Sequence, residues 1–161
     1  MDWIQAFILG IMQGLTEFLP ISSSGHLVLA QHILDVETPG ILLEVVLHMG
    51  TLVAILIYFY DDIKQLLQSV IKASENAREY TIYLIIATIP IICAGLLFRD
   101  IIETTFTVSI VKWMLMITGF VVGSTYFFKN RSRRELVVIT ALCIGFAQVF
   151  ALLPGISRSG V

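Results

Sequence analysis

The chain has 161 residues, of which 57% are hydrophobic and only 14% are charged. This composition is far more apolar than that of a soluble domain, and it excludes a water-soluble globule. The formal net charge is −2, and there is no long basic face on which a nucleic-acid backbone could be neutralised. DNA and RNA are therefore not expected as partners.

Three stretches have the length and the apolar character of membrane-spanning helices. A helix that crosses a bilayer needs about 20 mostly apolar residues. The stretches that meet this requirement are residues 41–60, 81–98 and 108–128. They predict an all-α, polytopic membrane helix bundle that forms a single membrane domain over residues 1–161.

Two further apolar runs are interrupted by polar residues, and each ends at a proline. The run over residues 3–20 contains Gln13 and Glu17, and the run over residues 136–153 contains Gln148. Exposed backbone in lipid is costly, so broken apolar segments that carry polar groups are typical of helices that line a cavity. Both runs are therefore predicted to be broken or re-entrant helices.

The distribution of basic residues predicts an orientation in the membrane. The connectors over residues 61–80 and 129–135 hold seven of the ten Lys and Arg, whereas the connectors over residues 21–40 and 99–107 hold only Arg99. Because Lys and Arg concentrate in cytoplasmic loops, the first two connectors are expected to be cytoplasmic. The other two are expected to be external loops.

Within the first inner connector, apolar residues recur at helical spacing among polar ones. They are Ile63, Leu66, Leu67, Val70 and Ile71. This pattern predicts an amphipathic helix that lies on the membrane surface, and a simple solvated connector is the alternative.

Two segments of the chain, 135 residues apart, have the same sequence pattern. Both copies contain Gly-x-x-Gln, then seven residues, then Ile-Ser-x-Ser-Gly. The matched pairs are Gly10 and Gly145, Gln13 and Gln148, Ile21 and Ile156, Ser22 and Ser157, Ser24 and Ser159, and Gly25 and Gly160. A chance match of this kind is improbable, so the pattern predicts an internal repeat. Convergent turn composition is the alternative.

Three predicted crossings, an odd number, separate the two copies. If both broken runs are re-entrant, they enter the membrane from opposite faces and form an inverted-topology repeat. If both runs span the membrane fully, the copies are parallel. Residues 1–135 are predicted to be the first repeat, and residues 136–161 the start of a second. The chain is accordingly expected to be a fragment of a two-repeat protein.

Ionisable groups in membrane segments are candidates for function. Gln13 and Glu17 lie at positions i and i+4, so on a helix they project from one face into the same cavity. Glu17 could hold a divalent cation such as Mg²⁺, which binds few carboxylates together with waters and phosphate oxygens. His26 could act as a nucleophile or a proton donor near neutral pH.

The turns that follow the broken runs carry hydroxyl groups, open backbone N–H groups and one arginine. The hydroxyls belong to Thr16, Ser22, Ser23, Ser24, Ser157 and Ser159. Arg158 has a planar fork that matches phosphate oxygens, and N–H groups at the start of a helix favour negative charge. A hydroxyl beside His26 could be activated as a nucleophile. These groups together fit phosphoryl transfer.

A second polar pair, Glu44 and His48, is also spaced at i and i+4, within a predicted spanning helix. Two such residues do not make a metal site. A buried polar pair that packs against the broken runs is the favoured interpretation.

The two motifs resemble those of the undecaprenyl-diphosphate phosphatase family of bacterial integral membrane proteins, also called bacitracin-resistance proteins. The first family signature is a Glu or Gln, a Glu four residues later, and then Pro-x-Ser-Ser-x-Gly-His, which matches Gln13 to His26. The second signature, Pro-Gly-x-Ser-Arg-Ser-Gly, matches Pro154 to Gly160. Both signatures are long and specific.

The resemblance implies hydrolysis of undecaprenyl diphosphate to undecaprenyl phosphate and inorganic phosphate, which recycles the lipid carrier for peptidoglycan and other cell-wall polymers. It also implies an inverted repeat with re-entrant helices in the bacterial plasma membrane. The site is expected to open to the outer side.

The resemblance also implies roles for individual residues. Glu17 would be catalytic or metal-associated, with Mg²⁺ as the cofactor and Ca²⁺ as the alternative. Ser23 and His26 would supply the nucleophile and the acid or base, in either assignment, and Arg158 would grip the diphosphate. The expected substrate-binding residues are Gln13, Ser22, Ser24, Ser157, Ser159 and Gly160.

Two other functions fit parts of the pattern. The type 2 phosphatidic acid phosphatases also use a Ser-Gly-His turn and a Ser-Arg pair, but the Lys-x6-Arg-Pro segment that they need is missing here. A transporter or flippase for an anionic lipid is the second alternative, because broken repeat helices with polar turns are transporter architecture.

Overall fold

The computed structural model describes residues 1–38, 41–72, 75–128 and 137–160, which form eight α-helices and two short 3-10 helices, with no strand among them. The predicted all-α fold is confirmed. The elements are α1 (Trp3–Thr16), α2 (Ser23–Ile33), α3 (Leu42–Tyr58), α4 (Tyr60–Ile71), α5 (Glu75–Leu97), α6 (Arg99–Thr104), α7 (Val108–Thr125), η1 (Tyr126–Phe128), α8 (Val138–Phe150) and η2 (Arg158–Gly160).

The helices α1 and α2 form a hairpin that packs on itself. Asp2 caps α1 through a reciprocal capping box with Gln5, which satisfies backbone donors at the helix start. Leu9 of α1 and Leu27 of α2 are fully buried, and they form the centre of a hydrophobic cluster that continues onto α3. Burial of apolar side chains between the two helices therefore stabilises the hairpin.

The prediction that residues 21–40 form a loop is wrong for most of its described part, because Ser23–Ile33 is helical. Ser22 caps this helix by accepting a hydrogen bond from the Gly25 N–H at 3.3 Å. Residues 99–107 also contain a helix, α6, where a loop is predicted.

The helices α1 and α2 are each shorter than a membrane span. The 14 residues of α1 extend about 21 Å at 1.5 Å per residue, whereas the hydrocarbon core of a bilayer is about 30 Å thick. The chain then turns and α2 packs back against α1. Of the two topologies left open by the repeat, these lengths and the return of the chain favour the re-entrant one for this copy.

Among the described residues, two helices are long and apolar enough by themselves to cross a membrane. They comprise Ala77–Leu97 within α5 and Val108–Thr125, which is α7, and they match the spans predicted at 81–98 and 108–128. The third predicted span corresponds to α3, which is followed after a bend of 72° by α4. The helix α4 is the predicted amphipathic segment, and its direction differs sharply from that of α3.

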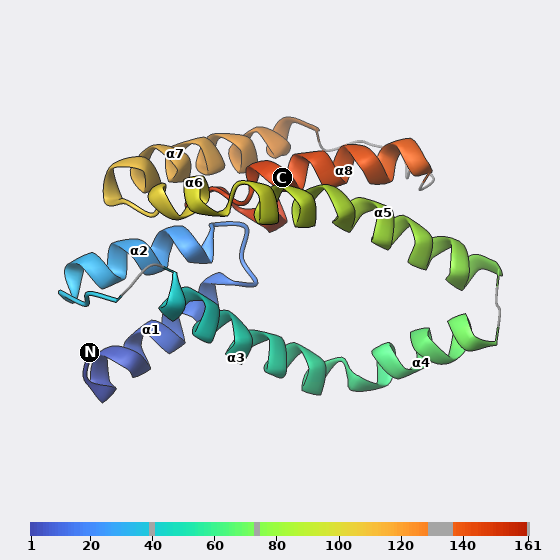
Figure 1. Ribbon diagram of the computed structural model, residues 1–161, viewed down its shortest axis with the longest axis horizontal. Helices are drawn as coiled ribbons and strands as arrows, with labels where there is room; N and C mark the ends of the chain where they lie inside the picture. Colours follow the sequence, from blue (N-terminus) through green and yellow to red (C-terminus); the bar gives the residue numbers. More distant parts are fainter. Residues whose placement is uncertain (39–40, 73–74, 129–136, 161) are drawn as a thin grey trace.

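The two broken runs approach each other from opposite ends of the molecule. In Figure 1, α1 runs from the left toward the centre, and α8 runs toward the centre from the right. The first residues of α1 and α8, Trp3 and Val138, are separated by the same 135 positions as the matched motifs. This arrangement has the geometry of an inverted repeat, in which the two turns meet near the middle.

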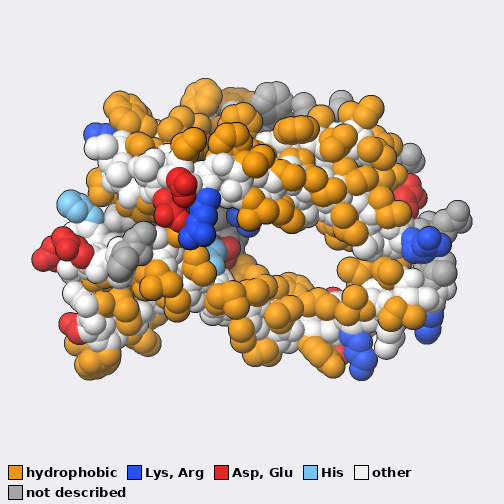
Figure 2. Space-filling view, viewed as in Figure 1, with side chains coloured by type: hydrophobic (Ala, Val, Ile, Leu, Met, Phe, Trp, Pro, Cys, Tyr) orange, Lys and Arg blue, Asp and Glu red, His pale blue; other side chains and the backbone are white. Residues whose placement is uncertain are grey.

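Most of the visible surface is apolar. Figure 2 shows hydrophobic side chains over the sides of the helices and charged groups gathered mainly at the edges, with an opening between the α3–α4 arm and α5. Large side chains such as Ile57 and Phe120 are 73% and 80% exposed. Exposure on this scale requires contact with lipid or protein, and the chain is a membrane protein with apolar spans.

The helix α8 lies directly against α5, and a glycine makes the approach possible. A Cβ atom at Gly145 would lie 2.6 Å from the carbonyl oxygen of Ala87 and 2.9 Å from Cγ of Pro90. Small residues allow membrane helices to pack with their backbones close together. Gly10, which the repeat pairs with Gly145, has no atom within 4 Å of such a Cβ.

The repeat therefore offers a matched pair of glycine substitutions. We expect Gly145→Ala to destabilise the protein by about 1–3 kcal/mol, because the added methyl group overlaps with backbone. Gly10→Ala should be neutral or stabilising by up to about 1 kcal/mol, because alanine favours helix. Thermal and denaturant unfolding in detergent, followed by circular dichroism, checks this difference. Equal stability of the two variants would contradict the close packing of α8 on α5.

Candidate functional site

The first turn connects α1 to α2 and is organised by Ser22. This residue has a φ of 65°, which is an unusual backbone conformation for any residue other than glycine. Its hydroxyl oxygen accepts hydrogen bonds from the N–H groups of Gly25 at 3.3 Å and of Gly155 at 3.1 Å. The second of these bonds joins the first turn to the turn that follows α8.

The second turn is held by α7. Thr118 is 6% exposed; its hydroxyl donates to the carbonyl oxygen of Gly155 at 2.7 Å and accepts from the N–H of Ser157 at 3.1 Å. Gly155 has a φ of 100°, and a Cβ there would lie 2.6 Å from Cβ of Met114. Only glycine fits this position, since both the conformation and the space exclude a side chain.

The two turns touch and repeat the same internal contact. A Cβ at Gly25 would lie 2.8 Å from the Cα of Gly155, so the two backbones are in direct contact. The hydroxyls of Ser22 and Ser24 are 3.3 Å apart, and those of their repeat partners Ser157 and Ser159 are 3.2 Å apart. The four serines thus form two equivalent pairs at the meeting point.

A pocket of about 310 Å³ opens where the turns meet. We call it the turn pocket. It is lined by Thr16, Glu17, Leu19, Ser22, Ser23, Ser24, His48, Ala151, Ile156, Ser157, Arg158 and Ser159. Most of the predicted site residues, from both copies of the motif, are therefore brought together.

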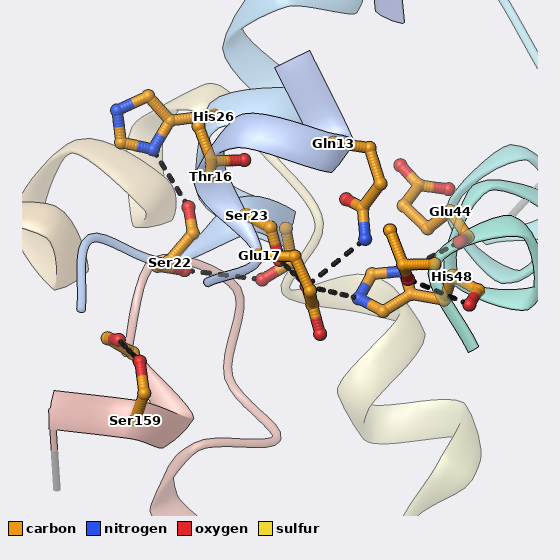
Figure 3. Close-up of polar contacts among 12 residues, drawn as sticks. Gln13, Thr16, Glu17, Ser22, Ser23, His26, Glu44, His48 and Ser159 are labelled. Carbon is orange, nitrogen blue, oxygen red and sulfur yellow. Dashed lines mark hydrogen bonds and ion pairs between the residues drawn. The ribbon is translucent and has the colours of Figure 1, made fainter. Parts of the chain in front are cut away.

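Glu17 accepts several polar contacts in the turn pocket. Its Oε2 atom accepts hydrogen bonds from the hydroxyl of Ser23 at 2.5 Å and from Nε2 of Gln13 at 3.1 Å, and it lies 3.4 Å from Nε2 of His48. Figure 3 shows these three side chains converging on one carboxylate. Its other oxygen, Oε1, has no hydrogen-bond partner among the described residues.

His48 belongs to this site although the sequence motifs do not include it. Its Nδ1 atom lies 2.7 Å from the carbonyl oxygen of Glu44; because a carbonyl only accepts, Nδ1 carries the hydrogen. The Nε2 atom therefore faces Glu17, and the contact becomes an ion pair when Nε2 is also protonated. The i, i+4 pair in a spanning helix is the signal that points to this residue.

His26 lies apart from Glu17 and Ser23. Its Nδ1 atom is 2.8 Å from the carbonyl oxygen of Ser22, and it is not among the residues that line the turn pocket. Figure 3 shows its ring directed away from Gln13 and His48. The structure thus places Ser23 beside a carboxylate rather than beside the predicted histidine partner.

Three other predicted residues have different environments. Arg158 begins η2, is exposed, and has no acidic ion-pair partner in the part of the chain that the structure describes. Gln13 is 1% exposed and reaches the pocket only through Glu17. Gly160 lines a neighbouring apolar pocket together with Ser157.

A second hollow of about 470 Å³ runs from the turn pocket along α3. We call it the α3 groove. Its polar lining residues are Glu17, Ser24, Glu44, His48, Thr51 and Arg158. Its apolar wall includes Val45, Met49, Leu52, Ile55, Ile102, Phe106 and Leu152. The turn pocket and the α3 groove share five lining residues, among them Glu17 and Arg158, so a polar pocket is continuous with a largely apolar groove.

Comparison with known proteins identifies relatives of the chain. A family model described as bacitracin resistance protein BacA matches residues 6–161. The undecaprenyl-diphosphatase of Halothermothrix orenii is 43% identical over 99% of this chain and 61% of the relative. The undecaprenyl-diphosphatase of Syntrophotalea carbinolica is 44% identical over 99% of this chain and 64% of the relative. The chain spans about 61–64% of the length of these curated relatives.

The role of Thr118 in holding the second turn can be tested by removing its hydroxyl group alone. We expect Thr118→Val to destabilise the protein by about 1–3 kcal/mol, because the buried polar groups of Gly155 and Ser157 lose a partner. Thr118→Ser keeps the hydroxyl and should retain most of that stability. Denaturant unfolding in detergent compares the two; equal loss in both variants would show that the methyl group, not the hydrogen bonds, matters.

Proposed function

Since the chain belongs to the bacitracin resistance protein BacA family, we propose that it hydrolyses undecaprenyl diphosphate to undecaprenyl phosphate and inorganic phosphate. The names of the relatives support this substrate. The observation that carries the proposal is the convergence of Glu17, Ser23 and Arg158 in one pocket built from both turns. The reaction would return the lipid carrier to cell-wall synthesis.

The turn pocket has the groups needed to bind a diphosphate. Arg158 presents a guanidinium fork that can bind phosphate oxygens in a bidentate manner. The hydroxyls of Ser24, Ser157 and Ser159 line the same pocket and can donate further hydrogen bonds. One arginine and several neutral donors suit an anionic headgroup that has to leave again as product.

Ser23 is the proposed nucleophile, and Glu17 is the proposed base. The Ser23 hydroxyl already donates to Glu17 Oε2 at 2.5 Å, so the carboxylate can take the proton when the oxygen attacks the terminal phosphorus. Undecaprenyl phosphate would leave, and water would then hydrolyse the phosphoserine. His48, whose Nε2 faces Glu17, would stabilise the carboxylate in the required orientation. His26, which lies outside the turn pocket, stays a predicted catalytic residue.

A divalent cation is proposed as cofactor, with Mg²⁺ first and Ca²⁺ as the alternative. The buried Oε1 of Gln13 has no hydrogen-bond partner, and Oε1 of Glu17 also has none among the described residues. Glu17 lines the turn pocket, and its carboxylate is a hard oxygen donor that fits a cation taking its remaining ligands from water and phosphate. Such a cation would neutralise phosphate charge. The described residues contain no cluster of three acidic, His or Cys ligands, so Glu17 would hold it together with substrate, and Gln13 would orient the carboxylate through its hydrogen bond.

The α3 groove is the proposed site of the prenyl chain. It begins at Arg158 and continues over apolar side chains of α3 such as Met49 and Leu52. Burial of each CH₂ group contributes about 0.8 kcal/mol, so a long tail supplies binding energy that the headgroup pocket does not. The groove therefore favours a lipid diphosphate over a small soluble one.

The proposed location is the bacterial plasma membrane, with the site open to the outer side. Lys64 and Lys72, and Arg78 within α5, belong to the connector that the charge distribution predicts to be cytoplasmic. The other basic connector, residues 129–135, lies outside the described residues. In Figure 1, α4 is at the opposite end of the molecule from α2, which supports an outward-facing site.

The pairing of Ser23 with Glu17 predicts coupled losses of activity. We expect Ser23→Ala and Glu17→Gln each to reduce phosphate release from undecaprenyl diphosphate by about 10²- to 10⁴-fold. The double variant should lose little more than either single variant, because the two groups act in one proton transfer. Ser69→Ala, which removes an exposed hydroxyl on α4, is the matched control and should keep full activity.

The assay measures phosphate release by the purified chain in detergent with Mg²⁺, with the Halothermothrix orenii relative as the assay control. No release by a folded wild-type chain would contradict the proposed function. If vesicles containing that chain then moved the lipid across the bilayer, the transporter alternative would replace it. If the losses of activity in the double variant were additive, Glu17 would not be the base that activates Ser23.

The groove predicts a split between two substrates. We expect Leu52→Asn to raise KM for undecaprenyl diphosphate about 10-fold, because a polar amide replaces apolar surface along the tail. Hydrolysis of inorganic pyrophosphate should be unchanged, since this substrate has no tail. Leu97→Asn, at an exposed position far along α5, controls for general effects of polarity. An equal effect on both substrates would place the tail elsewhere.

A further inference from the structure

Glu44 is a buried carboxylate in the first turn of α3, one helical turn before His48. It is 6% exposed, and the start of a helix stabilises negative charge. Its Oε1 atom accepts a hydrogen bond at 2.6 Å from Nε2 of Gln31, which belongs to α2. Its Oε2 atom is buried and has no hydrogen-bond partner in the described part of the chain. The bond from Gln31 is therefore the polar contact that links this carboxylate to α2.

The geometry of this link is fixed by a third side chain. The hydroxyl of Thr38 donates to Oε1 of Gln31 at 3.0 Å. Because the amide oxygen accepts from Thr38, the amide nitrogen is the end that faces Glu44, and it can only donate. A hydrogen bond to a carboxylate is stronger than one between neutral groups, and it is stronger inside a protein than in water. The bond between Gln31 and Glu44 thus joins α2 and α3 in one defined orientation.

The same two helices carry groups of the turn pocket. The helix α2 begins at Ser23, whose hydroxyl donates to Oε2 of Glu17. The helix α3 carries His48, whose Nε2 lies 3.4 Å from that same oxygen. Figure 3 shows the His48 ring directed toward Glu17 and the Glu44 side chain directed away from this contact. Polar contacts therefore attach α3 to the hairpin at two points, one at His48 and one at Glu44.

Glu44 also lines the α3 groove, the proposed site of the prenyl chain. A side chain in the wall of this groove would act on the tail of the substrate, whereas an anchor of α3 would act on the headgroup chemistry. The carboxylate is engaged with Gln31, and little of the residue is exposed. These observations favour the anchor.

We propose that Glu44 is a positioning residue for phosphate release. Its hydrogen bond to Gln31 fixes α3 against α2 and so holds the His48 ring beside Glu17. The inference rests on the proposed function, in which Glu17 takes the proton of Ser23. Glu44 does not line the turn pocket, so it acts through His48. A misplacement of about 1 Å far from the chemistry can cost about 100-fold in rate, and loss of the anchor is therefore measurable.

Steady-state kinetics with two substrates separate the anchor from the groove wall. We expect Glu44→Ala to lower kcat about 10- to 100-fold for undecaprenyl diphosphate and for inorganic pyrophosphate, with KM little changed, because the headgroup chemistry is disturbed. Glu44→Gln keeps an oxygen that accepts from Gln31 and should retain most of the rate. Glu79→Ala, which removes an exposed carboxylate on α5, is the matched control. A raised KM for the lipid alone would assign Glu44 to the groove wall and overturn the proposal.

The route through His48 is tested with a double variant. Adding Glu44→Ala to His48→Ala should lower kcat little further, because the anchor then has no ring to hold in place. Additive losses of activity would show that Glu44 acts by another route, and they would also overturn the proposal.

A readout without substrate separates this inference from the proposed function. In protein labelled at the histidine nitrogens, the His48 resonance is identified by its loss in His48→Ala. Glu44→Ala and Glu17→Gln should both shift this resonance in detergent, and Glu44→Gln should leave it nearly unchanged. A folded wild-type chain that releases no phosphate contradicts the proposed function, whereas an unchanged resonance in Glu44→Ala contradicts the anchor.

Circular dichroism and size-exclusion chromatography establish that the variants are folded. If Glu44→Ala fails to fold, Gln31→Ala decides the question, because it breaks the same bond from a half-buried position on α2. It should lower kcat and shift the His48 resonance in the same direction as Glu44→Ala is expected to. A folded Gln31→Ala variant with wild-type kcat and an unshifted resonance would overturn the proposal.

Discussion

The arrangement of the whole protein depends on one contact, between two turns that lie between short helices. A turn at membrane depth has backbone groups that lipid cannot bind, so protein atoms must satisfy them. Ser22 accepts the Gly155 N–H across the contact, and Thr118 bonds to both ends of the second turn. The first turn and α7 therefore supply hydrogen-bond partners to the second turn. The absence of a side chain at Gly25 and Gly155 lets their backbones come close enough to do so.

The same constraint explains why the candidate site lies at this contact. Glu17 is the C-cap of α1, where the helix dipole disfavours a carboxylate. Gln13, Ser23 and His48 compensate by surrounding Oε2. A helix that ended in solvent would leave this carboxylate to water. Here the end of α1 meets a second turn, so the charged carboxylate of Glu17 lines the turn pocket.

Some of this arrangement could be predicted from sequence, and some could not. From the repeat at a fixed offset alone, one can predict that Ser22 and Ser157 lie close together, because equivalent re-entrant segments meet near the midplane of the membrane. The helix α2 was missed, because its serine-rich start resembles a loop and only Ser22 capping and the burial of Leu27 make it helical. The contact of Ser23 with Glu17 depends on the positive φ of Ser22, which motif spacing does not reveal.

The missing residue of the predicted site, His48, shows what α3 contributes. His48 and Glu44 lie one turn apart, and Nδ1 of His48 bonds to the Glu44 carbonyl. The His48 ring contacts Glu17 at the end of α1, and the Glu44 carboxylate accepts a hydrogen bond from Gln31 of α2. Movement of α3 relative to the hairpin would therefore break both contacts together. The position of Glu17 is set by a neighbouring helix as well as by its own turn, so the conformation of the re-entrant hairpin is held from outside.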